Sequence, residues 1–168
     1  TVIGNAEDPV NDMKMILNKY DYLQEFPQKV MAEVMSFSQK SIDKEISNRR
    51  DLRQWTSFTI DPVDAKDFDD AISIKQNRNG YELGVHIADV SHFVEQNTYI
   101  DREAIQRSTS VYFTEGVVHM LPEALSANLC SLRPNEDRLA VSAIMKMDKD
   151  FNIIETDILP TVINSKAR

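Results

Sequence analysis

The chain has 168 residues, of which 42% are apolar and 27% charged, and a formal net charge of −8. This composition is typical of a folded domain with a continuous core, and it excludes a disordered chain or a mini-protein that depends on cross-links. No apolar run approaches the roughly 18 residues that a membrane-spanning helix requires. Cys130 is the single cysteine and has no disulfide partner, which favours a reducing compartment, so we expect a cytoplasmic protein.

The first fifty residues have helical periodicity. Apolar residues recur at helical spacing in 9–20, which predicts an amphipathic helix, and Pro27 can begin a second helix that ends in the serine-rich stretch 36–41. The charged junction at 48–51 is more consistent with a solvated turn than with a phosphate site. The acidic balance of the whole chain argues against a binder that relies on clustered basic residues, but it leaves open an enzyme that reaches phosphate through metal ions.

From residue 56 onward the periodicity changes from helical to alternating. The composition of Asn79-Gly80 is that of a hairpin turn, and Asp148-Lys149-Asp150 joins a second pair of strands. The elements expected here are strands at 56–60, 71–75, 81–89 and 109–113, helices at 101–107 and 122–129, and a final hairpin of 139–147 and 151–158. We therefore expect an α+β fold, in which an N-terminal helical segment is followed by a mixed β-sheet with helices.

Five aspartates lie within ten positions, in the expected loop between the first two strands: Asp61, Asp64, Asp67, Asp69 and Asp70. Two carboxylates about 4 Å apart repel each other by roughly 4 kcal/mol at an effective dielectric near 20, so such a cluster needs protons, arginines or a cation. Oxygen ligands favour Mg²⁺, Mn²⁺ or Ca²⁺ over zinc, and the glycine and distal glutamate of an EF-hand are absent. Composition alone supports solvated loop acids about as well as a magnesium site. Phe68, between the acids, is expected to pack inward and anchor them.

Three stretches resemble a known family. They are Thr59-Ile60-Asp61-Pro62 continuing through Asp64-Ala65-Lys66-Asp67-Phe68-Asp69-Asp70-Ala71, then His86-Ile87-Ala88-Asp89-Val90-Ser91-His92-Phe93-Val94, and then Met120-Leu121-Pro122-Glu123 with Leu129-Cys130-Ser131-Leu132. In order and spacing these motifs are similar to the RNB catalytic domain of the ribonuclease II and ribonuclease R family. Because the motifs are long, chance agreement is a poor explanation.

The resemblance implies a Mg²⁺-dependent exoribonuclease that hydrolyses single-stranded RNA from its 3′ end and releases nucleoside 5′-monophosphates, with Mn²⁺ as a possible substitute. Matched position by position, the active-site residues would be Asp61, Asp67, Asp69 and Asp70, whereas Asp64 would be a turn residue. By the same similarity, Asp61 and Asp70 would be direct metal ligands. Asp67 and Asp69 would hold further metal or the attacking water. We expect the four carboxylates to converge within reach of a shared ion.

Other polar and aromatic residues are less specific. By the resemblance, Tyr112 would bind substrate by stacking on nucleotides near the 3′ end, and the alternative is a strand tyrosine at the core edge. We expect His86 and His92 to be structural rather than catalytic. For Arg133 and Arg138, contact with RNA phosphate and an ion pair with a neighbouring acid are both open.

The resemblance covers about residues 49–168. It implies that residues 1–50 are a helical linker and that residues 51–168 are the N-terminal, truncated part of the catalytic domain. The parent chain would then also carry cold-shock, remaining catalytic and S1-type domains, and we expect the fragment alone to be inactive or weakly active. Two alternatives stay open: a non-catalytic interaction module of the same family, and another Mg²⁺-dependent phosphodiesterase.

Overall fold

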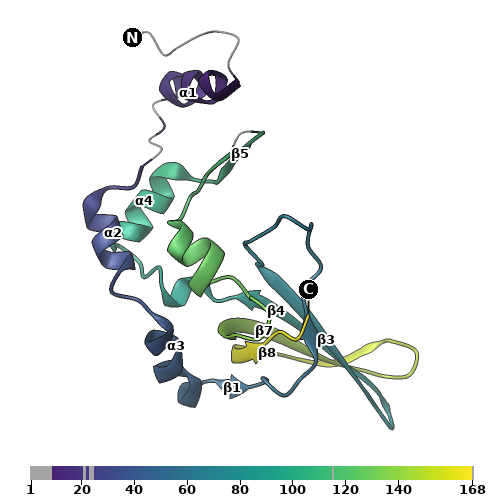
Figure 1. Cartoon of the computed structure of the whole chain (residues 1–168). Coiled ribbons are helices and arrows are strands. Elements are labelled where there is room, and N and C mark those ends of the chain that lie inside the picture. The colour runs from purple at the N-terminus through teal and green to yellow at the C-terminus, as the bar shows by residue number, and fades with distance from the viewer. Residues whose placement is uncertain (1–8, 21, 23–24, 115, 168) are drawn as a thin grey trace. The chain divides into compact units, whose positions relative to one another are not determined.

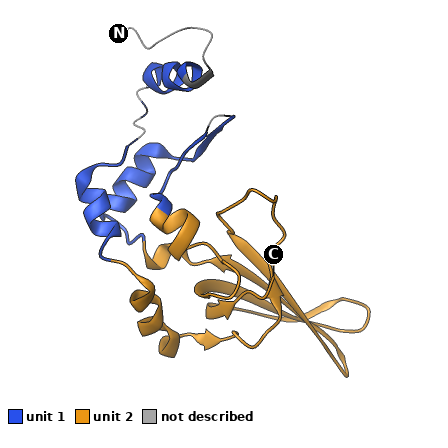
Figure 2. Cartoon of the chain, in the orientation of Figure 1, with its two compact units in different colours: residues 1–36, 94–123 blue, residues 37–93, 124–168 orange. Residues whose placement is uncertain are grey.

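The computed structural model describes residues 9–20, 22, 25–114 and 116–167 (Figure 1). The chain divides into two compact units, which Figure 2 colours separately. Unit 1 combines residues 1–36 with 94–123, and unit 2 combines residues 37–93 with 124–168. None of the helices in the described ranges is both long enough and apolar enough to cross a membrane.

The helices are α1 (Pro9–Lys19), α2 (Gln28–Val34), α3 (Gln39–Glu45) and α4 (Tyr99–Arg107), with 3₁₀ turns at Ile46–Asn48 and Val90–His92 and a π-helical turn at Leu125–Leu129. The strands are β1 (Arg50–Asp51), β2 (Ser57–Phe58), β3 (Asp70–Asn77), β4 (Gly80–Ala88), β5 (Val111–Phe113), β6 (Gly116–Val118), β7 (Asp137–Met147) and β8 (Ile153–Asn164). Strands β5 and β6 form a small hairpin in unit 1, and the other strands form one sheet in unit 2.

Unit 1 is held together by helix packing and by side-chain caps at the start of α4, from Thr98 and from Glu33. The Ile100 N–H, in the first turn of α4, donates a hydrogen bond of 2.9 Å to the carboxylate of Glu33 on α2. The first N–H groups of a helix have no partner within the helix, so this carboxylate both satisfies a donor and complements the helix dipole. Helix α1 buries Met13 and Leu17 against Val118 of β6.

Unit 2 is built on a six-stranded sheet with the order β1-β8-β7-β4-β3-β2. Neighbouring strands are antiparallel except β1 and β8, which are parallel. Beyond β8 the chain runs beside β2: the Lys166 N–H donates to the Ser57 carbonyl at 2.8 Å, and the Thr59 N–H donates to the Ala167 carbonyl at 3.2 Å. The sheet therefore curls towards closure. It encloses an apolar core of Leu52, Trp55, Phe68, Ala71, Ala88, Leu132, Ala140, Ile144 and Ile163.

The expected α+β fold is confirmed. The helix expected at 9–20 is α1, and the strands expected at 71–75 and 81–89 are β3 and β4, joined at the Asn79-Gly80 turn. The final hairpin is β7 and β8, but β8 continues to Asn164 because its second half pairs with both β7 and β1. Buried and more exposed residues alternate over the first half of β3 and over much of β4 and β7, which is the pattern that predicts a strand, whereas β8 lacks it.

Three local expectations need correction. The strand expected at 56–60 is reduced to the two residues of β2, and the helix expected at 122–129 is wound as a π-helical turn over its last five residues. At 48–51 the expected exposure holds for Asn48, Arg50 and Asp51, but the expected turn is wrong. Arg50–Asp51 forms β1, whose partner β8 lies more than a hundred residues further along the chain. A pairing of this sequence separation leaves no local signal.

The side chain of Arg49 is buried, although the sequence predicts a solvated residue at this position. Its guanidinium forms an ion pair of 2.7 Å with Asp89, which is itself buried. Burial alone would raise the pKa of Asp89, but the hydrogen bond from Ser91 and the bond and charge of Arg49 outweigh it, so this pKa lies below its usual range. Removing one partner would leave an uncompensated buried charge, which typically costs about 3–5 kcal/mol.

His86 is the centre of a line of polar side chains that crosses the buried face of the sheet. Its Nε2 lies 2.8 Å from the Ser73 hydroxyl on β3, and its Nδ1 lies 2.7 Å from the Ser142 hydroxyl on β7. Ser142 in turn lies 2.6 Å from the hydroxyl of Thr161 on β8. The four side chains come from four adjacent strands, so the sheet register satisfies each buried polar group with the next. His86 is structural, as the sequence predicts.

We expect the stability of the fold to decrease as the pH falls from about 6.5, the ordinary histidine value, to about 4. Burial lowers the pKa of His86 to about 4. Between pH 6.5 and pH 4 the imidazole of His86 is protonated in the unfolded chain but neutral in the folded chain. The stabilisation is therefore fully present above pH 6.5 and is lost progressively as the pH falls below it. The loss attributable to His86 is at most about 3 kcal/mol.

Urea unfolding at a series of pH values measures this effect in the wild type and in His86→Gln, which keeps hydrogen-bonding capacity but does not titrate. The variant should have a shallower dependence of stability on pH in this range than the wild type. An imidazole NMR titration that gives His86 an ordinary pKa would contradict the assignment.

Candidate active site

The acidic segment is the loop between β2 and β3. A backbone hydrogen bond of 3.1 Å from the Ala65 N–H to the Pro62 carbonyl closes a turn, and it places the exposed Asp64 within that turn. Phe68 is buried in the core of unit 2, as expected of an apolar anchor. The loop ends where the Asp69 carbonyl accepts a hydrogen bond of 2.9 Å from the Ala88 N–H of β4, so Asp69 and the strand residue Asp70 are fixed relative to the sheet.

Ser131 fastens this loop on both sides of Asp67. Its side-chain hydroxyl donates a hydrogen bond of 2.9 Å to the Lys66 carbonyl and accepts one of 3.0 Å from the Phe68 N–H. The Leu132 N–H adds a bond of 2.9 Å to the Phe68 carbonyl. Ser131 is fully buried, so these bonds have no competition from water and hold the backbone that carries the carboxylates.

Arg138 supports the segment that carries Ser131. Its Nε donates to the Ser131 carbonyl at 3.0 Å and to the Asn128 carbonyl at 3.2 Å, and its guanidinium also pairs with Glu136. The side chain is only 1% exposed, so it is a structural group and not a surface contact for RNA phosphate. Arg133 also pairs with Glu136, at 3.4 Å. Of the two interpretations left open by the sequence, the ion pair is the one observed for both arginines.

The four aspartates predicted as catalytic interact electrostatically. The pKa of Asp69 is raised above its ordinary value. The first cause is that surrounding protein atoms displace part of the hydration of its carboxylate, even though the side chain remains accessible to solvent. The second is the charge of nearby carboxylates, which in decreasing order of effect are Asp67, Asp70 and Asp61. Asp64 is not among them, which agrees with its predicted place in the turn.

The donor set fits a hard divalent cation. All four side chains offer oxygen ligands, and Oδ2 of Asp61 is buried without a hydrogen-bond partner among the described residues. A buried carboxylate oxygen without a donor is costly unless a cation or proton compensates it. Yet no three acidic, histidine or cysteine side chains in the described ranges lie close enough together to share an ion. The expected convergence of the four carboxylates on one shared ion is thus not present among the described residues.

The remaining predicted residues have simple surroundings. Tyr112 lies on β5 in unit 1, opposite Val117, with 64% of its side chain exposed, so it is not a core tyrosine. Its stacking on RNA stays a prediction. His92 packs edge to face on Phe93, with ring centroids 4.9 Å apart. Cys130 is buried, and burial together with nearby negative charge raises the pKa of its thiol to about 12, so it is not a nucleophile at neutral pH.

The sequence did not assign a role to Ser131 or Arg138 in positioning the acidic loop. Ser131 belongs to the Leu129-Cys130-Ser131-Leu132 motif, which is one of the stretches that carry the family resemblance. The motif alone does not show which backbone groups the Ser131 side chain bonds. The loop and Ser131 lie more than sixty positions apart in the chain, and only the folded structure brings them together.

Comparison with protein families matches residues 49–168 to the RNB domain. The chain belongs to the RNB family. It is 48% identical over 167 residues to a protein named ribonuclease R from Chlamydia trachomatis, covering 99% of this chain and 24% of that protein. The chain therefore spans about a quarter of the length of this relative.

Solved structures of RNB proteins show the same fold. Ribonuclease R of Mycoplasma genitalium, in complex with ribose-methylated single-stranded RNA, superposes with a TM-score of 0.90 at 36% identity, over 100% of this chain and 26% of that one. A yeast protein described as a pseudonuclease superposes with a TM-score of 0.77 at 23% identity, over 99% of this chain and 22% of that one. This second likeness concerns the fold alone.

We expect Asp69→Asn to stabilise this RNB chain at pH 7 in the presence of a chelator. The raised pKa means that the charged carboxylate is disfavoured in the folded state, so its removal relieves a penalty that is present above the folded pKa and absent below about 3.8. Thermal unfolding should show a rise in Tm of about 1–3 °C. Asp64→Asn, in the same loop, is the matched control and should change Tm less. A lower Tm for Asp69→Asn than for the control would contradict the repulsion.

Ser131→Ala should destabilise unit 2 by about 1–3 kcal/mol, because it leaves the Lys66 carbonyl and the Phe68 N–H without their buried partner. Urea unfolding measures the loss, and hydrogen exchange should show faster exchange of the Phe68 amide. Ser126→Ala provides the control. The Ser126 hydroxyl is also buried, but it has no hydrogen-bond partner in the described ranges, so its removal should cost much less. Equal losses in the two variants would show that the Ser131 bonds do not hold the loop.

Proposed function

We propose that this chain is part of a divalent-metal-dependent exoribonuclease that shortens RNA from its 3′ end and releases nucleoside 5′-monophosphates. Membership of the RNB family and the similarity to proteins named ribonuclease R support the reaction class. The single observation that carries the assignment to this chain is the acidic loop, in which Asp69 experiences the charges of the other three aspartates while Ser131 fixes the backbone between them.

In this proposal Asp61 and Asp70 hold Mg²⁺, for which Mn²⁺ can substitute, and Asp67 and Asp69 hold further metal or orient the attacking water. The bound metal would lower the pKa of water and neutralise charge on the phosphoryl oxygens. The oxygen of water attacks the terminal phosphorus, and the bond from phosphorus to the 3′ oxygen of the preceding nucleotide breaks. That 3′ oxygen leaves with a proton, so the products are one nucleoside 5′-monophosphate and an RNA one nucleotide shorter.

Tyr112 is proposed to stack on a base near the 3′ end. An exposed aromatic ring contributes about 1–3 kcal/mol per stacked base and does not discriminate between sequences. RNA is the proposed partner partly because two structures of the Mycoplasma genitalium relative contain it, one with single-stranded and one with double-stranded RNA. We further propose residues 1–50 as a linker before the catalytic domain, cold-shock, further catalytic and S1-type domains in the parent chain, and a cytoplasmic location.

The second candidate is a non-catalytic RNB module. It is favoured by one observation, the occurrence of this fold in a yeast protein described as a pseudonuclease. The fold therefore does not decide between activity and its loss. The aspartates of the loop favour the first candidate, because hydrolysis requires the carboxylates and a purely structural module does not.

The full-length parent should release labelled mononucleotide from a 3′-labelled single-stranded RNA in Mg²⁺, and a chelator should abolish the release. Asp70→Asn should reduce the rate by about 100-fold or more, because it removes a proposed metal ligand. The 168-residue chain alone should have little or no activity. The measurement is gel or chromatographic analysis of products over time.

Asp64→Asn is the control within the same loop and should retain wild-type activity. Undiminished activity of Asp70→Asn would refute the ligand role. RNA binding by an inactive wild type would favour the non-catalytic module, and internal cleavage or activity confined to DNA would favour a different phosphodiesterase.

A further inference from the structure

The hairpin of β5 and β6 in unit 1 has one packed face and one exposed face. Cross-strand partners lie on the same face of a hairpin, and successive residues of a strand alternate between the two faces. Val118, on β6, is buried and packs against Met13 and Leu17 of α1. The preceding residue, Val117, is the cross-strand partner of Tyr112, so this pair lies on the opposite, exposed face. The Tyr112 ring therefore stands on a hairpin that is supported from behind by the N-terminal helix.

Arg107, the last residue of α4, ties this hairpin to the chain that precedes α2. Its Nη2 donates a hydrogen bond of 2.9 Å to the Glu25 carbonyl, and its Nη1 donates one of 3.2 Å to the His119 carbonyl, one residue beyond β6. Its Nε donates one of 2.8 Å to the carboxylate of Glu103, one turn earlier on the helix. The guanidinium also lies over the Phe26 ring, 3.8 Å from its centroid. One side chain thus joins the helix, the chain before α2 and the end of the hairpin.

Tyr22 holds the beginning of the hairpin in the same way. Its hydroxyl lies 2.7 Å from the Thr109 carbonyl, two residues before β5, and 3.0 Å from the Arg107 carbonyl. The base of the hairpin is closed by the Met120 N–H, which donates a hydrogen bond of 2.9 Å to the Ser110 hydroxyl. Both strands are therefore held where they enter and leave the hairpin, and the bonds come from residues that lie before α2 and at the end of α4.

The contacts of Arg107 require a guanidinium. Three of its nitrogens donate hydrogen bonds to three different groups, and the residue is only 5% exposed. A lysine has one ammonium group on a flexible stem and does not reproduce this planar fork. Replacement by lysine would keep the positive charge beside Glu103 but would not reach both carbonyls at once.

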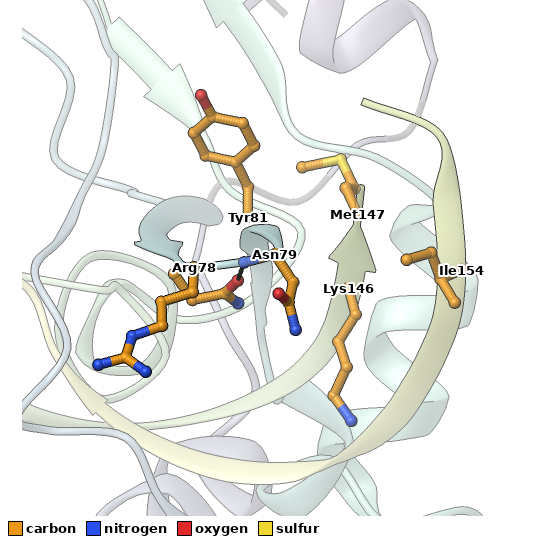
Figure 3. Close-up of a pocket in the computed structure, with 7 residues that line it drawn as sticks. Arg78, Asn79, Tyr81, Lys146, Met147 and Ile154 are labelled. Atoms are coloured by element: carbon orange, nitrogen blue, oxygen red, sulfur yellow. Dashed lines mark hydrogen bonds between the residues drawn. The ribbon is translucent and has the colours of Figure 1, made fainter. Parts of the chain in front are cut away.

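Tyr81 in unit 2 is a contrasting aromatic residue. It lines a hollow of about 470 Å³ together with Lys146 (Figure 3). Its ring is stacked on Phe151, with ring centroids 4.8 Å apart, so one face of the ring is already covered by protein. Lys146 pairs with Glu155 at 2.7 Å, which reduces the attraction of the hollow for a phosphate. This hollow therefore suits an RNA base less well than the exposed ring on β5.

We propose that Arg107 and Tyr22 are positioning residues for RNA binding, because they hold the hairpin so that the Tyr112 ring meets a base near the 3′ end. This inference rests on the proposed stacking of Tyr112. Neither positioning side chain touches RNA, since Arg107 is buried and the Tyr22 hydroxyl is bonded to the backbone. A ring that is fixed before RNA arrives loses less conformational freedom on binding, which favours the complex. The chain before α2 would then support the substrate-binding hairpin as well as link domains.

The test uses the full-length protein, a chelator to prevent cleavage, and single-stranded RNAs that carry 2-aminopurine at one of the last nucleotides. Stacking quenches the fluorescence of this base, so the labelled position that brightens in Tyr112→Ala is the one that stacks on Tyr112. At that position Arg107→Lys should raise the fluorescence of the bound RNA and weaken binding by about 3- to 10-fold, a part of the effect of losing one stacked base. Adding Arg107→Lys to Tyr112→Ala should change neither value further, because both substitutions act through the same ring.

Arg102→Lys is the matched control, because Arg102 lies on the same helix but is exposed. It should leave both fluorescence and affinity at their wild-type values. Tyr22→Phe removes only one hydroxyl and provides a second variant in case Arg107→Lys does not fold. It should brighten the same labelled position and no other.

Unchanged fluorescence in both Arg107→Lys and Tyr22→Phe, at a position that responds to Tyr112→Ala, would overturn the proposal and leave the proposed function intact. Equal brightening at every labelled position, or a further loss when Arg107→Lys is added to Tyr112→Ala, would reveal a general loss of structure and would also overturn it. If no position responds to Tyr112→Ala, the stacking role fails and the positioning roles fail with it. Mononucleotide release by the wild type in Mg²⁺ tests the nuclease assignment separately.

Discussion

The buried hydroxyl of Ser131 bonds to the backbone on both sides of Asp67, and the proposed chemistry of this chain depends on that contact. Carboxylates that repel one another cannot hold their own loop in place. Neutral hydrogen bonds from a buried side chain can, because they are insensitive to the charges on the loop. Phe68 completes the attachment by burying its ring in the core. Partial loss of hydration and, after it, the charges of the neighbouring carboxylates raise the pKa of Asp69.

Polar groups within unit 2 are arranged in two different ways. In the sheet, His86 and its hydroxyl neighbours satisfy one another across four strands, and burial keeps the imidazole neutral. Elsewhere in unit 2, the buried side chains of Arg49 and of Arg138 on β7 are each paired with an acid. Both arrangements give a buried polar or charged group a partner, without which its burial would be costly.

Family membership and the local arrangement of the acids answer different questions. The RNB match and the superposition with ribonuclease R establish what fold this sequence adopts. The likeness to a yeast protein described as a pseudonuclease concerns the fold alone, so it leaves the activity of this chain to be tested. In this chain Asp69 is electrostatically coupled to Asp67, Asp70 and Asp61, and no three acidic, histidine or cysteine side chains in the described ranges lie close enough together to share an ion. A site that is completed by cation and further chain would have these properties.

The sequence by itself determined the fold class, the strands β3, β4, β7 and the first half of β8, and the identity of the acidic loop. Alternation of apolar residues and the spacing of the aspartates are local properties, so a single segment contains the whole signal. Only the tertiary structure decided the contacts between distant segments. Arg49 is buried against Asp89, β1 pairs with β8, and Ser131 bonds the loop, because each partner is brought by a different part of the chain. The positions of the four carboxylates were also undecided by sequence, since the backbone that carries them is held by bonds from Ser131, Leu132 and Ala88, which lie elsewhere in the chain.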